Sequence, residues 1–368
     1  MNKDIILIIS PEQGGGGGCW NLRINQFANY INQTQQFQTK VITSPIPIFD
    51  GNILNQCKGI LVQRPFNIVL PWLKEYKNLQ PKYNYKMVFE VDDAFWNIIP
   101  DYNPSSLNNR DWNAVEMAST ENLKYFDCGI VTTDFLANYL KYHHNFWNIV
   151  VVPNVADRAI YQSNRKDFFR DKPIVLSAGA SQHIREPQQI GPNAPHGVTA
   201  LRGDYCGKWV EFIRNNIDKI DLHYCINVPY FFQDLADKIT VHPWKTTGMY
   251  SAELNQLRPD IIIAPLKNND FNRAKSSLKF AEAAASGAIL MGSVFPDSPY
   301  NMIHPLCKVP DEPTEEQLNI VFNNIKNNWK EILDYQYNFI NNNGWWLQSS
   351  HSIAKWINAI SVNNEVLV

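Results

Sequence analysis

The sequence of 368 residues lacks the features that would place it in a specialised class. Its six cysteines are scattered and include no Cys-x-x-Cys pair, which argues against a disulfide framework or a zinc site and favours a reduced, cytoplasmic chain. No apolar run exceeds strand length, so no transmembrane segment is expected, and the first ten residues do not read as a signal peptide. A formal net charge of −2 gives no global reason to expect nucleic acid or an anionic membrane as a partner.

What the sequence does contain is an ordinary globular composition, with 45% hydrophobic and 18% charged residues. At ~150 residues per domain the length predicts two domains, which we place at residues 1–160 and 161–368. Short apolar runs alternate with helical patterns in both halves, so the predicted fold class is α/β with parallel sheets. Strands are predicted at 5–10, 39–43, 59–63, 86–91, 128–133, 148–152, 173–177, 222–226, 239–244, 261–264 and 288–291, and helices at 19–33, 70–79, 112–125, 135–142, 209–215, 315–335 and 345–360.

The stretch 261–293 combines two apolar strands with a polar loop and a short helix between them. At helical spacing, Lys275, Lys279 and Glu282 share one face of that helix, while leucine and alanine lie toward the other. A lysine in a first helical turn opposes the helix dipole but is well placed beside a bound anion. The free N–H groups of the turn and the hydroxyls of Ser276 and Ser277 add donors for phosphate oxygens.

Glu282 lies roughly 10 Å along the helix axis from Lys275, at ~1.5 Å per residue. A carboxylate at that distance can accept hydrogen bonds from both hydroxyls of a ribose whose phosphates are held at the lysine end. The segment therefore predicts a binding site for a nucleoside diphosphate.

The same segment carries the pattern Pro-Leu-x-x-x-x-Phe-Asn-x-x-Lys-Ser-x-Leu-Lys-x-x-Glu-x-x-Ala-x-Gly, from Pro265 to Gly287. It resembles the donor-binding motif of GT-B glycosyltransferases, closest to the retaining group that includes glycogen and sucrose synthases, in its bacterial and phage branch. Residues 62–65 and 90–104 also resemble motifs of that branch. In the group, the second glutamate of a Glu-x-x-x-x-x-x-x-Glu pair contacts the ribose, and Glu282 matches it. The first glutamate would fall at Ala274 and is missing; we assign its role of holding sugar hydroxyls to Asp270 or Asn272.

The resemblance implies a GT-B architecture of two facing, doubly wound Rossmann-like domains. A C-terminal helix is expected to cross back to the first domain, and Trp345 and Trp346 are expected to seal that contact. It implies transfer of a sugar from a nucleoside diphosphate sugar, first of all a UDP-sugar, to an acceptor hydroxyl with retention of configuration. No cofactor and no essential divalent metal are expected. The expected acceptor is a glycan or other cell-surface molecule; the alternative is a 5-hydroxymethylpyrimidine in phage DNA.

Several residues of the first half are expected to line the cleft. Residues 11–18 form a glycine-rich loop in which Gly16, Gly17 and Gly18 would let an acceptor approach the backbone, unless the loop is merely a surface loop. In the resembling family such a loop ends in an arginine, which Arg23 matches, and we expect Arg23 to help stabilise the departing diphosphate. Arg64, at the carboxyl end of a strand, is expected to meet a phosphate or the acceptor, or otherwise to form a surface salt bridge.

Asp92 and Asp93 follow a buried strand, where adjacent carboxylates are costly unless they are solvated, paired or used in function. We expect them to orient acceptor or sugar hydroxyls; an inverting enzyme would use one of them as a general base. A structural alternative pairs Asp92 with a lysine and makes Asp93 a cap. Another alternative treats Glu90, Asp92 and Asp93 as the magnesium or manganese site of a GT-A transferase.

The second half supplies the remaining donor-binding candidates. Gly179, Ser181 and His183 follow a predicted strand and are expected to approach the donor phosphates, residues 184–205 are expected to form a loop or lid, and Trp244 is expected to stack on a nucleobase. Lys275, Ser276 and Lys279 would stabilise the departing diphosphate. Because the first glutamate is absent, a non-catalytic module that binds nucleotide sugars is the alternative to an enzyme.

Overall fold

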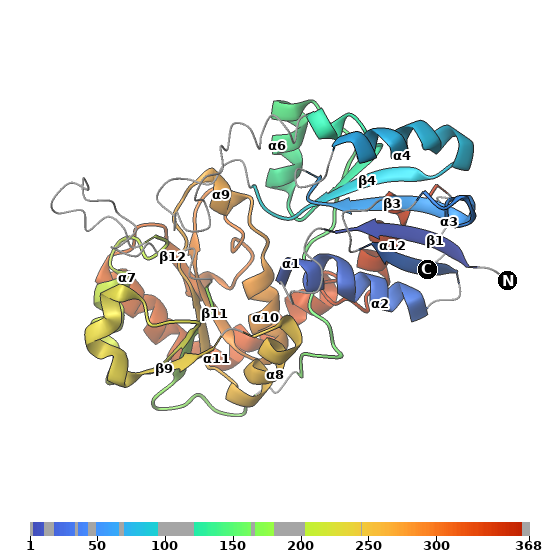
Figure 1. Cartoon of the computed structure of the whole chain (residues 1–368). Coiled ribbons are helices and arrows are strands. Elements are labelled where there is room, and N and C mark those ends of the chain that lie inside the picture. Colours follow the sequence, from blue (N-terminus) through green and yellow to red (C-terminus); the bar gives the residue numbers. More distant parts are fainter. Residues whose placement is uncertain are drawn as a thin grey trace.

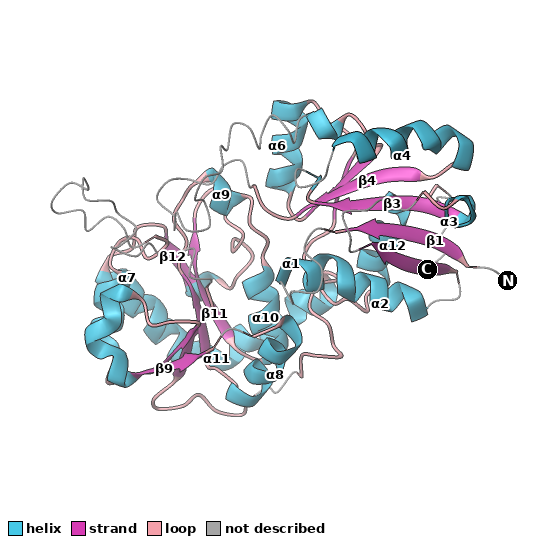
Figure 2. Ribbon diagram, viewed as in Figure 1, coloured by secondary structure: helices cyan, strands magenta, loops and turns pink. Residues whose placement is uncertain are grey.

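The chain builds two separate parallel sheets, one in each half of the sequence, and they lie in two facing lobes (Figure 1). The computed structural model describes residues 3–10, 18–33, 36–42, 49–65, 70–94, 121–162, 166–179, 203–243 and 245–362. Every strand pairing in it is parallel. Helices cover both faces of each sheet (Figure 2), which explains why the strands are apolar runs without polar alternation.

The first sheet has the strand order β2-β1-β3-β4-β5-β6. Adjacent residues of one strand enter different cores: Leu7 packs with α4 and α6 on one face, whereas Ile6 and Ile8 pack with α2 and α12 on the other. Its strands are β1 (Asp4–Ile9), β2 (Phe37–Ile42), β3 (Cys57–Gln63), β4 (Lys86–Val91), β5 (Cys128–Val131) and β6 (Ile149–Val151). The helices of this half are α1 (Gly18–Trp20), a π-helical turn (Asn21–Asn25), α2 (Gln26–Gln33), α3 (Gly51–Gln56), α4 (Leu70–Tyr83) and α6 (Asp134–His144).

The second sheet has the order β12-β11-β10-β7-β8-β9. Its strands are β7 (Ile174–Ser177), β8 (Asp221–Cys225), β9 (Ile239–His242), β10 (Ile261–Ala264), β11 (Ile289–Val294) and β12 (Lys308–Pro310). Its helices are α7 (Trp209–Asn216), α8 (Thr247–Leu257), α9 (Asp270–Arg273), α10 (Leu278–Ser286) and α11 (Glu315–Asn342), with 3-10 helices at Tyr230–Lys238 and Pro305–Cys307.

Each sheet has a topological switch point, because the chain first adds strands on one side and then returns to add them on the other. In the second sheet this point lies between β7 and β10, and in the first between β1 and β3. Ligands of open α/β sheets bind outside the carboxyl ends of the strands at such a point. The topology therefore places the expected site between the two lobes.

The last helix, α12 (Ser350–Ile360), returns to the first sheet, as expected. Trp356 is fully buried there and stacks on Phe27 of α2 with ring centroids 5.6 Å apart. The expectation that Trp345 and Trp346 seal this contact is wrong. Trp345 packs edge-on against aromatic side chains of the second half, and Trp346 belongs to the core of that half, so the tryptophan that fills the first lobe comes ten residues later.

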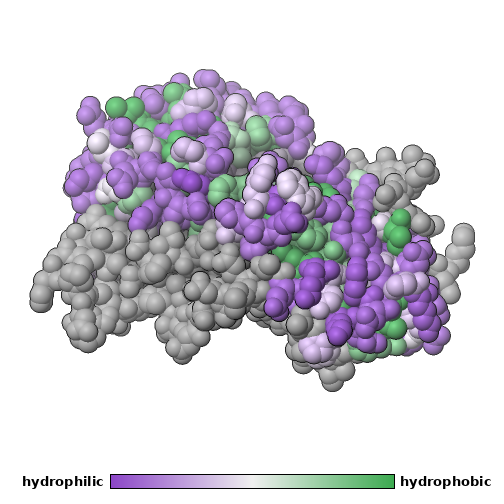
Figure 3. Space-filling model, turned by 90° about the horizontal axis from the view of Figure 1, so that it is seen from above, coloured by the Kyte–Doolittle hydropathy of each residue, from purple (hydrophilic) through white to green (hydrophobic). Residues whose placement is uncertain are grey.

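No helix among the described residues is long and apolar enough to cross a membrane. On the face seen in Figure 3, hydrophilic side chains predominate among the coloured residues and hydrophobic ones occur in small groups between them.

Candidate functional site

A cavity of about 280 Å³ lies between the two lobes at the switch point of the second sheet. Its walls come from the ends of β7 and β10 and from the segment leading into α10, and the first lobe contributes Cys19, Asp92 and Asp93. Ser177 and Gly179 stand at the end of β7, and a Cβ atom added to Gly179 would meet no atom of the described residues within 4 Å. The predicted position of Gly179 beside a ligand space is thus matched by an open approach to its backbone.

A second cavity of about 230 Å³ adjoins the first, and the two share Leu22, Ala178, Gly179, Leu278 and Lys279 in their walls. We call the first the central cavity and the second the outer cavity. The outer cavity extends to the ends of β8 and β9. Because they share these wall residues, we call the pair of cavities the groove.

Lys279 and Glu282 lie where the two cavities meet. Lys279 Nζ donates to Glu282 Oε2 at 2.7 Å, and the Tyr161 hydroxyl donates to Glu282 Oε1 at 3.4 Å. Glu282 is only 3% exposed yet lines the outer cavity, and Lys279 lines both cavities. Burial and the adjacent Glu282 raise the pKa of Tyr161 well above its ordinary value, so this hydroxyl keeps its proton. The carboxylate is therefore held in position at the wall of the outer cavity.

Lys275 lies on the wall of the central cavity, but it is not in a first helical turn as expected. The segment forms two helices, α9 ending at Arg273 and α10 beginning at Leu278, because Asn269 caps the first and Ser277 starts the second. Lys275 stands in the turn between them, with Nζ 3.9 Å from Asp93 Oδ1 and 4.3 Å from the ring centre of Phe271. The lysine thus precedes α10 in the chain and does not oppose the helix dipole from inside the helix.

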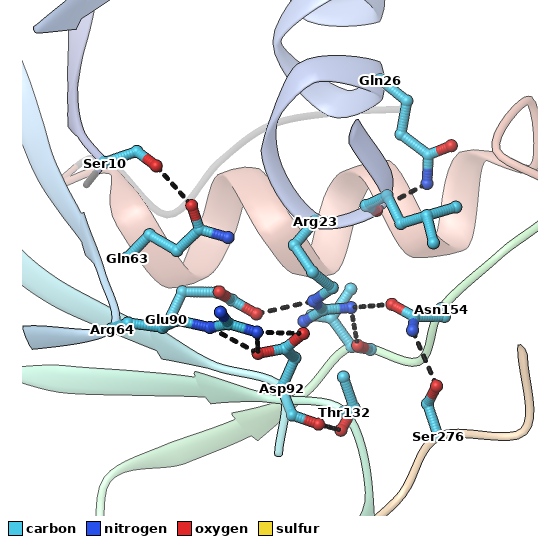
Figure 4. Close-up of polar contacts among 12 residues, drawn as sticks. Ser10, Arg23, Gln26, Gln63, Arg64, Glu90, Asp92, Thr132, Asn154 and Ser276 are labelled. Atoms are coloured by element: carbon cyan, nitrogen blue, oxygen red, sulfur yellow. Dashed lines mark hydrogen bonds and ion pairs between the residues drawn. The ribbon is translucent and has the colours of Figure 1, made fainter. Parts of the chain in front are cut away.

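Ser276 links the two lobes beside this lysine. Its Oγ accepts a hydrogen bond of 2.7 Å from Asn154 Nδ2, and the side-chain oxygen of Asn154 accepts from Arg23 at 3.1 Å (Figure 4). Ser276 also lines the central cavity.

Asp92 lines the central cavity and is paired with an arginine, whereas the structural alternative named a lysine. Arg64 donates from Nε and Nη2 to Asp92 at 3.0–3.2 Å. Burial raises the pKa of Asp92, but Arg64 and the Cys19 thiol outweigh it and keep the pKa below its usual value. Arg64, which adopts a left-handed backbone (φ 50°), is not part of either cavity wall. Its side chain forms this buried ion pair, and its predicted contact with a phosphate or acceptor stays a prediction.

Arg23 also differs from the expectation. Its side chain is fully buried, donates to Glu90 Oε1 at 2.6 Å and to the carbonyl of Val152 at 2.7 Å, and lines neither cavity (Figure 4). Arg23 therefore connects the π-helical turn to β4 and to the segment between the lobes, and its expected role toward the diphosphate stays a prediction. Arg23 stands at the motif position of the arginine that ends the glycine-rich loop. Its side chain nevertheless lies in the core, because the buried carboxyl group of Glu90 accepts its hydrogen bond there.

The carboxylates expected as an alternative metal site are separated by these arginines. Glu90 is fully buried against Arg23, and burial raises its pKa to about 7 despite the neighbouring guanidinium. Asp92 faces Arg64. Among the residues that the structure describes, no group of three or more histidine, cysteine or acidic side chains is placed to hold a metal ion.

The structure places Asp270 and Asn272 outside both cavities, and their assignment to sugar-hydroxyl binding stays a prediction. Asn272 is fully buried, and its Nδ2 donates to Asp204 Oδ1 at 2.7 Å and to the carbonyl of Lys267 at 2.8 Å. Asp270 pairs with Arg273 one turn along the same helix. Neither residue is in the wall of the two cavities.

Five of the predicted residues, Gly16, Gly17, Ser181, His183 and Trp244, lie outside the described residues, as does most of the expected lid, and these predictions stay predictions. Gly18 is the first residue of α1. The residue after Trp244, Lys245, does line the outer cavity, together with Glu253 and Pro243.

Sequence reasoning missed several residues of the central cavity, above all Asp204, Tyr205 and Tyr300. Asp204 and Tyr205 lie a few residues before α7, and Tyr300 lies a few residues after β11; all three line the central cavity, beside the carboxyl ends of β7 and β10. An acidic residue beside a tyrosine just before a helix was the only local signal, and it has no fixed spacing from the Lys275 segment.

Comparison with known proteins finds likeness in structure only. No family model and no curated protein matches the sequence. HepE of Anabaena, solved in complex with UDP and glucose, matches with a TM-score of 0.58 at 9% identity, over 98% of this chain and 100% of that one. TarM of S. aureus matches with a TM-score of 0.51 at 13% identity, over 83% of this chain and 55% of TarM, so this chain spans about half the length of that protein.

The fold is of the GT-B type. Its two facing parallel sheets, the cavity between them and the last helix that crosses back to the first lobe agree with the architecture predicted from the 265–287 motif.

Proposed function

We propose that this protein is a glycosyltransferase that moves a sugar from a nucleoside diphosphate sugar to an acceptor hydroxyl. The observation that carries the proposal is the groove at the switch point, in which Lys275 and Ser276 line one cavity, Glu282 lines the adjoining one, and Lys279 lines both. The fold shared with HepE, a protein solved with UDP and glucose, supports a UDP-sugar as the first donor to test.

In this proposal the diphosphate lies in front of the N-terminal end of α10. The first N–H groups of a helix lack partners within it and favour an anion, and the ammonium groups of Lys275 and Lys279 add positive charge. Glu282 accepts from the ribose hydroxyls in the outer cavity, and the backbone at Gly179 gives the phosphates room. Charge that develops on the departing diphosphate is then stabilised by groups already in position, which is the usual source of large rate effects in such sites.

The proposed reaction retains the configuration of the sugar. The bond between the anomeric carbon and the diphosphate breaks, the acceptor oxygen bonds to the same face, and the leaving phosphate oxygen takes the acceptor proton. Asp93, 3.9 Å from Lys275, and Asp92, held as a carboxylate by Arg64, orient hydroxyl groups. A carboxylate with a lowered pKa is a weak base, which suits an orienting role for Asp92 better than general-base catalysis.

We propose a glycan as acceptor and expect no requirement for a divalent metal, because the lysines supply the positive charge. Purified protein in excess chelator should therefore retain full activity. A complete loss of activity in chelator, restored by magnesium or manganese, would refute this part of the proposal.

Binding and slow hydrolysis of a nucleotide sugar test the donor assignment without knowledge of the acceptor. Wild type should bind UDP by calorimetry and release glucose slowly from UDP-glucose, and Lys275→Ala should lower both by at least tenfold. Lys326→Ala, an exposed lysine on α11, is the matched control and should behave as wild type. If wild type binds no nucleoside diphosphate, the proposal fails; if it binds UDP but never hydrolyses or transfers a sugar, the protein is a binding module.

Once an acceptor is found, the anomeric form of the product decides the stereochemical part. An α-linked product from an α-linked donor supports retention, and a β-linked product would require an inverting reaction with an acidic residue as base. Glycans and DNA containing hydroxymethylpyrimidine are assayed side by side, and transfer to the DNA alone would overturn the glycan assignment.

A further inference from the structure

Two charged residues of the outer cavity, Lys245 and Glu253, have no role in the function proposed above. Both line the outer cavity and are absent from the wall of the central one. Among the described residues of this wall, the other charged ones are Lys279 and Glu282, which the proposed function assigns to the diphosphate and the ribose. A nucleotide held in that way extends its base into the remaining part of the outer cavity.

One oxygen of the Glu253 carboxylate is held by the protein, and the other faces no protein group. Oε1 accepts from His242 Nδ1 and from Lys245 Nζ, each at 2.7 Å. Oε2 forms no hydrogen bond with the described residues, and the side chain is 16% exposed. Burial raises the pKa of Glu253, but the hydrogen bonds from Lys245 and His242 outweigh it and hold the pKa below its usual value. The ionised carboxylate can therefore only accept hydrogen bonds.

Two histidines outside the cavity wall fix the direction of this carboxylate. His242, at the end of β9, donates from Nδ1 to Glu253, because the carboxylate only accepts. Its Nε2 lies 2.7 Å from Nδ1 of His223 on the neighbouring strand β8, and the two rings are 22° from parallel. His223 is only 6% exposed, and neither histidine lines either cavity. The pair can act on a ligand only through Glu253.

Lys245 places a hydrogen-bond donor beside this acceptor. Its ammonium group has three N–H bonds, of which one is directed to Glu253, and its side chain is 25% exposed. Uracil carries the complementary pattern along one edge, where the N3–H group lies between two carbonyl oxygens. Cytosine has an acceptor nitrogen at that position, so it would face the carboxylate with a lone pair. Cys225, Ile226 and Pro243 line the same cavity and offer apolar surface to the faces of a base.

We propose that Glu253 accepts the N3–H of a uracil base and that Lys245 donates to a flanking carbonyl oxygen, so that this pair selects uracil over cytosine. His242, supported by His223, is a positioning residue, because it acts through the Glu253 carboxylate. The inference rests on the proposed function, since it takes the diphosphate to lie at the start of α10 and the ribose at Glu282.

Calorimetry with three nucleotides tests the base contact without an acceptor. UDP carries the N3–H group, 3-methyl-UDP lacks it, and CDP has an acceptor at the same place. Wild type is expected to bind UDP at least tenfold tighter than either. Glu253→Gln, which has the same shape, is expected to weaken UDP about 10- to 100-fold, the range for hydrogen bonds to a charged group, and to change 3-methyl-UDP less than threefold. Its amide N–H can donate to cytosine, so the preference for UDP over CDP should nearly disappear.

Two variants of His242 separate a positioning role from a structural one. His242→Phe keeps a ring but loses the N–H group, and it is expected to weaken UDP about 3- to 10-fold without changing the affinity for 3-methyl-UDP. His242→Gln, whose side chain can still donate to Glu253, should restore most of the UDP affinity. A merely structural role would weaken both nucleotides alike. Glu316→Gln, an exposed glutamate on α11 outside both cavities, is the matched control and should behave as wild type.

Equal binding of UDP and 3-methyl-UDP by wild type would overturn the inference, as would a Glu253→Gln variant that keeps the wild-type preference, or GDP or ADP bound more tightly than UDP. These results leave the proposed function intact, because a nucleoside diphosphate still binds. If Glu253→Gln does not fold, the wild-type preference for UDP over both CDP and 3-methyl-UDP decides. A wild type that binds no nucleoside diphosphate, whatever its base, would overturn the proposed function and the inference with it.

Discussion

Replacing Arg23 with methionine separates a structural role of this arginine from a catalytic one. The guanidinium is fully buried and supplies donors to Glu90, to the carbonyl of Val152 and to Asn154. Removing it leaves a buried carboxyl group and two oxygens without these donors. Breaking a buried pair in this way costs about 3–5 kcal/mol. At about 2–4 °C per kcal/mol for a unit of 150–250 residues, the melting temperature should fall by roughly 6–20 °C.

The loss should depend on pH, because burial raises the pKa of Glu90 to about 7. Below that pH the carboxyl is protonated in the folded protein, so the pair contributes less and the deficit of Arg23→Met should shrink as pH falls from 8 to 6. A double variant, Arg23→Met with Glu90→Leu, removes both charges and should recover most of the stability. Urea unfolding of the first lobe, monitored by fluorescence in the absence of nucleotide, measures each difference in the free energy of unfolding.

The affinity for UDP, measured well below the melting temperature, tests the alternative that Arg23 contacts the ligand. The buried position predicts that Arg23→Met binds UDP within threefold of wild type. A variant that keeps its stability but loses UDP binding by more than tenfold would show that Arg23 contacts the ligand, and the reading of its burial would be wrong.

Three further outcomes are expected. Glu282→Gln should weaken UDP binding about 10- to 100-fold and abolish the preference of wild type for UDP over 2′-deoxy-UDP, which calorimetry measures; a wild type without that preference contradicts a ribose contact. Burial raises the pKa of Asp127, but its hydrogen bonds, including one from Lys77, lower it below the usual value. Asp127→Asn should therefore lower the unfolding free energy by about 1–2 kcal/mol at pH 7, with the difference vanishing as pH falls from 4 to 2; a constant difference would contradict this. Gly59→Ala should destabilise by about 1–3 kcal/mol in urea titrations, because its Cβ would come 2.1 Å from the carbonyl oxygen of Ile360, and an unchanged midpoint would mean that α12 packs elsewhere.

The strands were predictable from the sequence because burial on both faces makes each one a short apolar run. β4 and β10 were predicted to the residue, and most others within two residues. β12 (Lys308–Pro310) was missed because it is three residues long and contains a proline, and α8 (Thr247–Leu257) was missed because apolar residues do not form a clear stripe along it. Tertiary contacts, and not local pattern, establish both elements.

The walls of the two cavities were predictable where several of their residues lie on one short segment. Lys275, Ser276, Lys279 and Glu282 form a local pattern, and the groove brings all four to its walls. Residues that depend on distant partners were not predictable. The motif position of Arg23 carries no information about the buried carboxyl group of Glu90 beneath it, which lies 67 residues away in the sequence.

Asp204 is a second residue whose place at the cavity could not be predicted from the sequence. It lies 68 residues before Asn272, the side chain that orients it, so neither sequence neighbourhood reveals that the two meet. A carboxylate that enters a site through a long-range contact becomes visible only when the sheet order is known.

The return of α12 to the first lobe has a consequence for synthesis on the ribosome. Phe27 and Ile6, on one face of the first sheet, are covered by side chains of α12 such as Trp356, which are translated more than 300 residues later. This apolar surface of the nascent first half therefore stays uncovered until α12 has left the exit tunnel. Chaperone contact during elongation, and aggregation of any product that ends before residue 350, follow from this order of assembly.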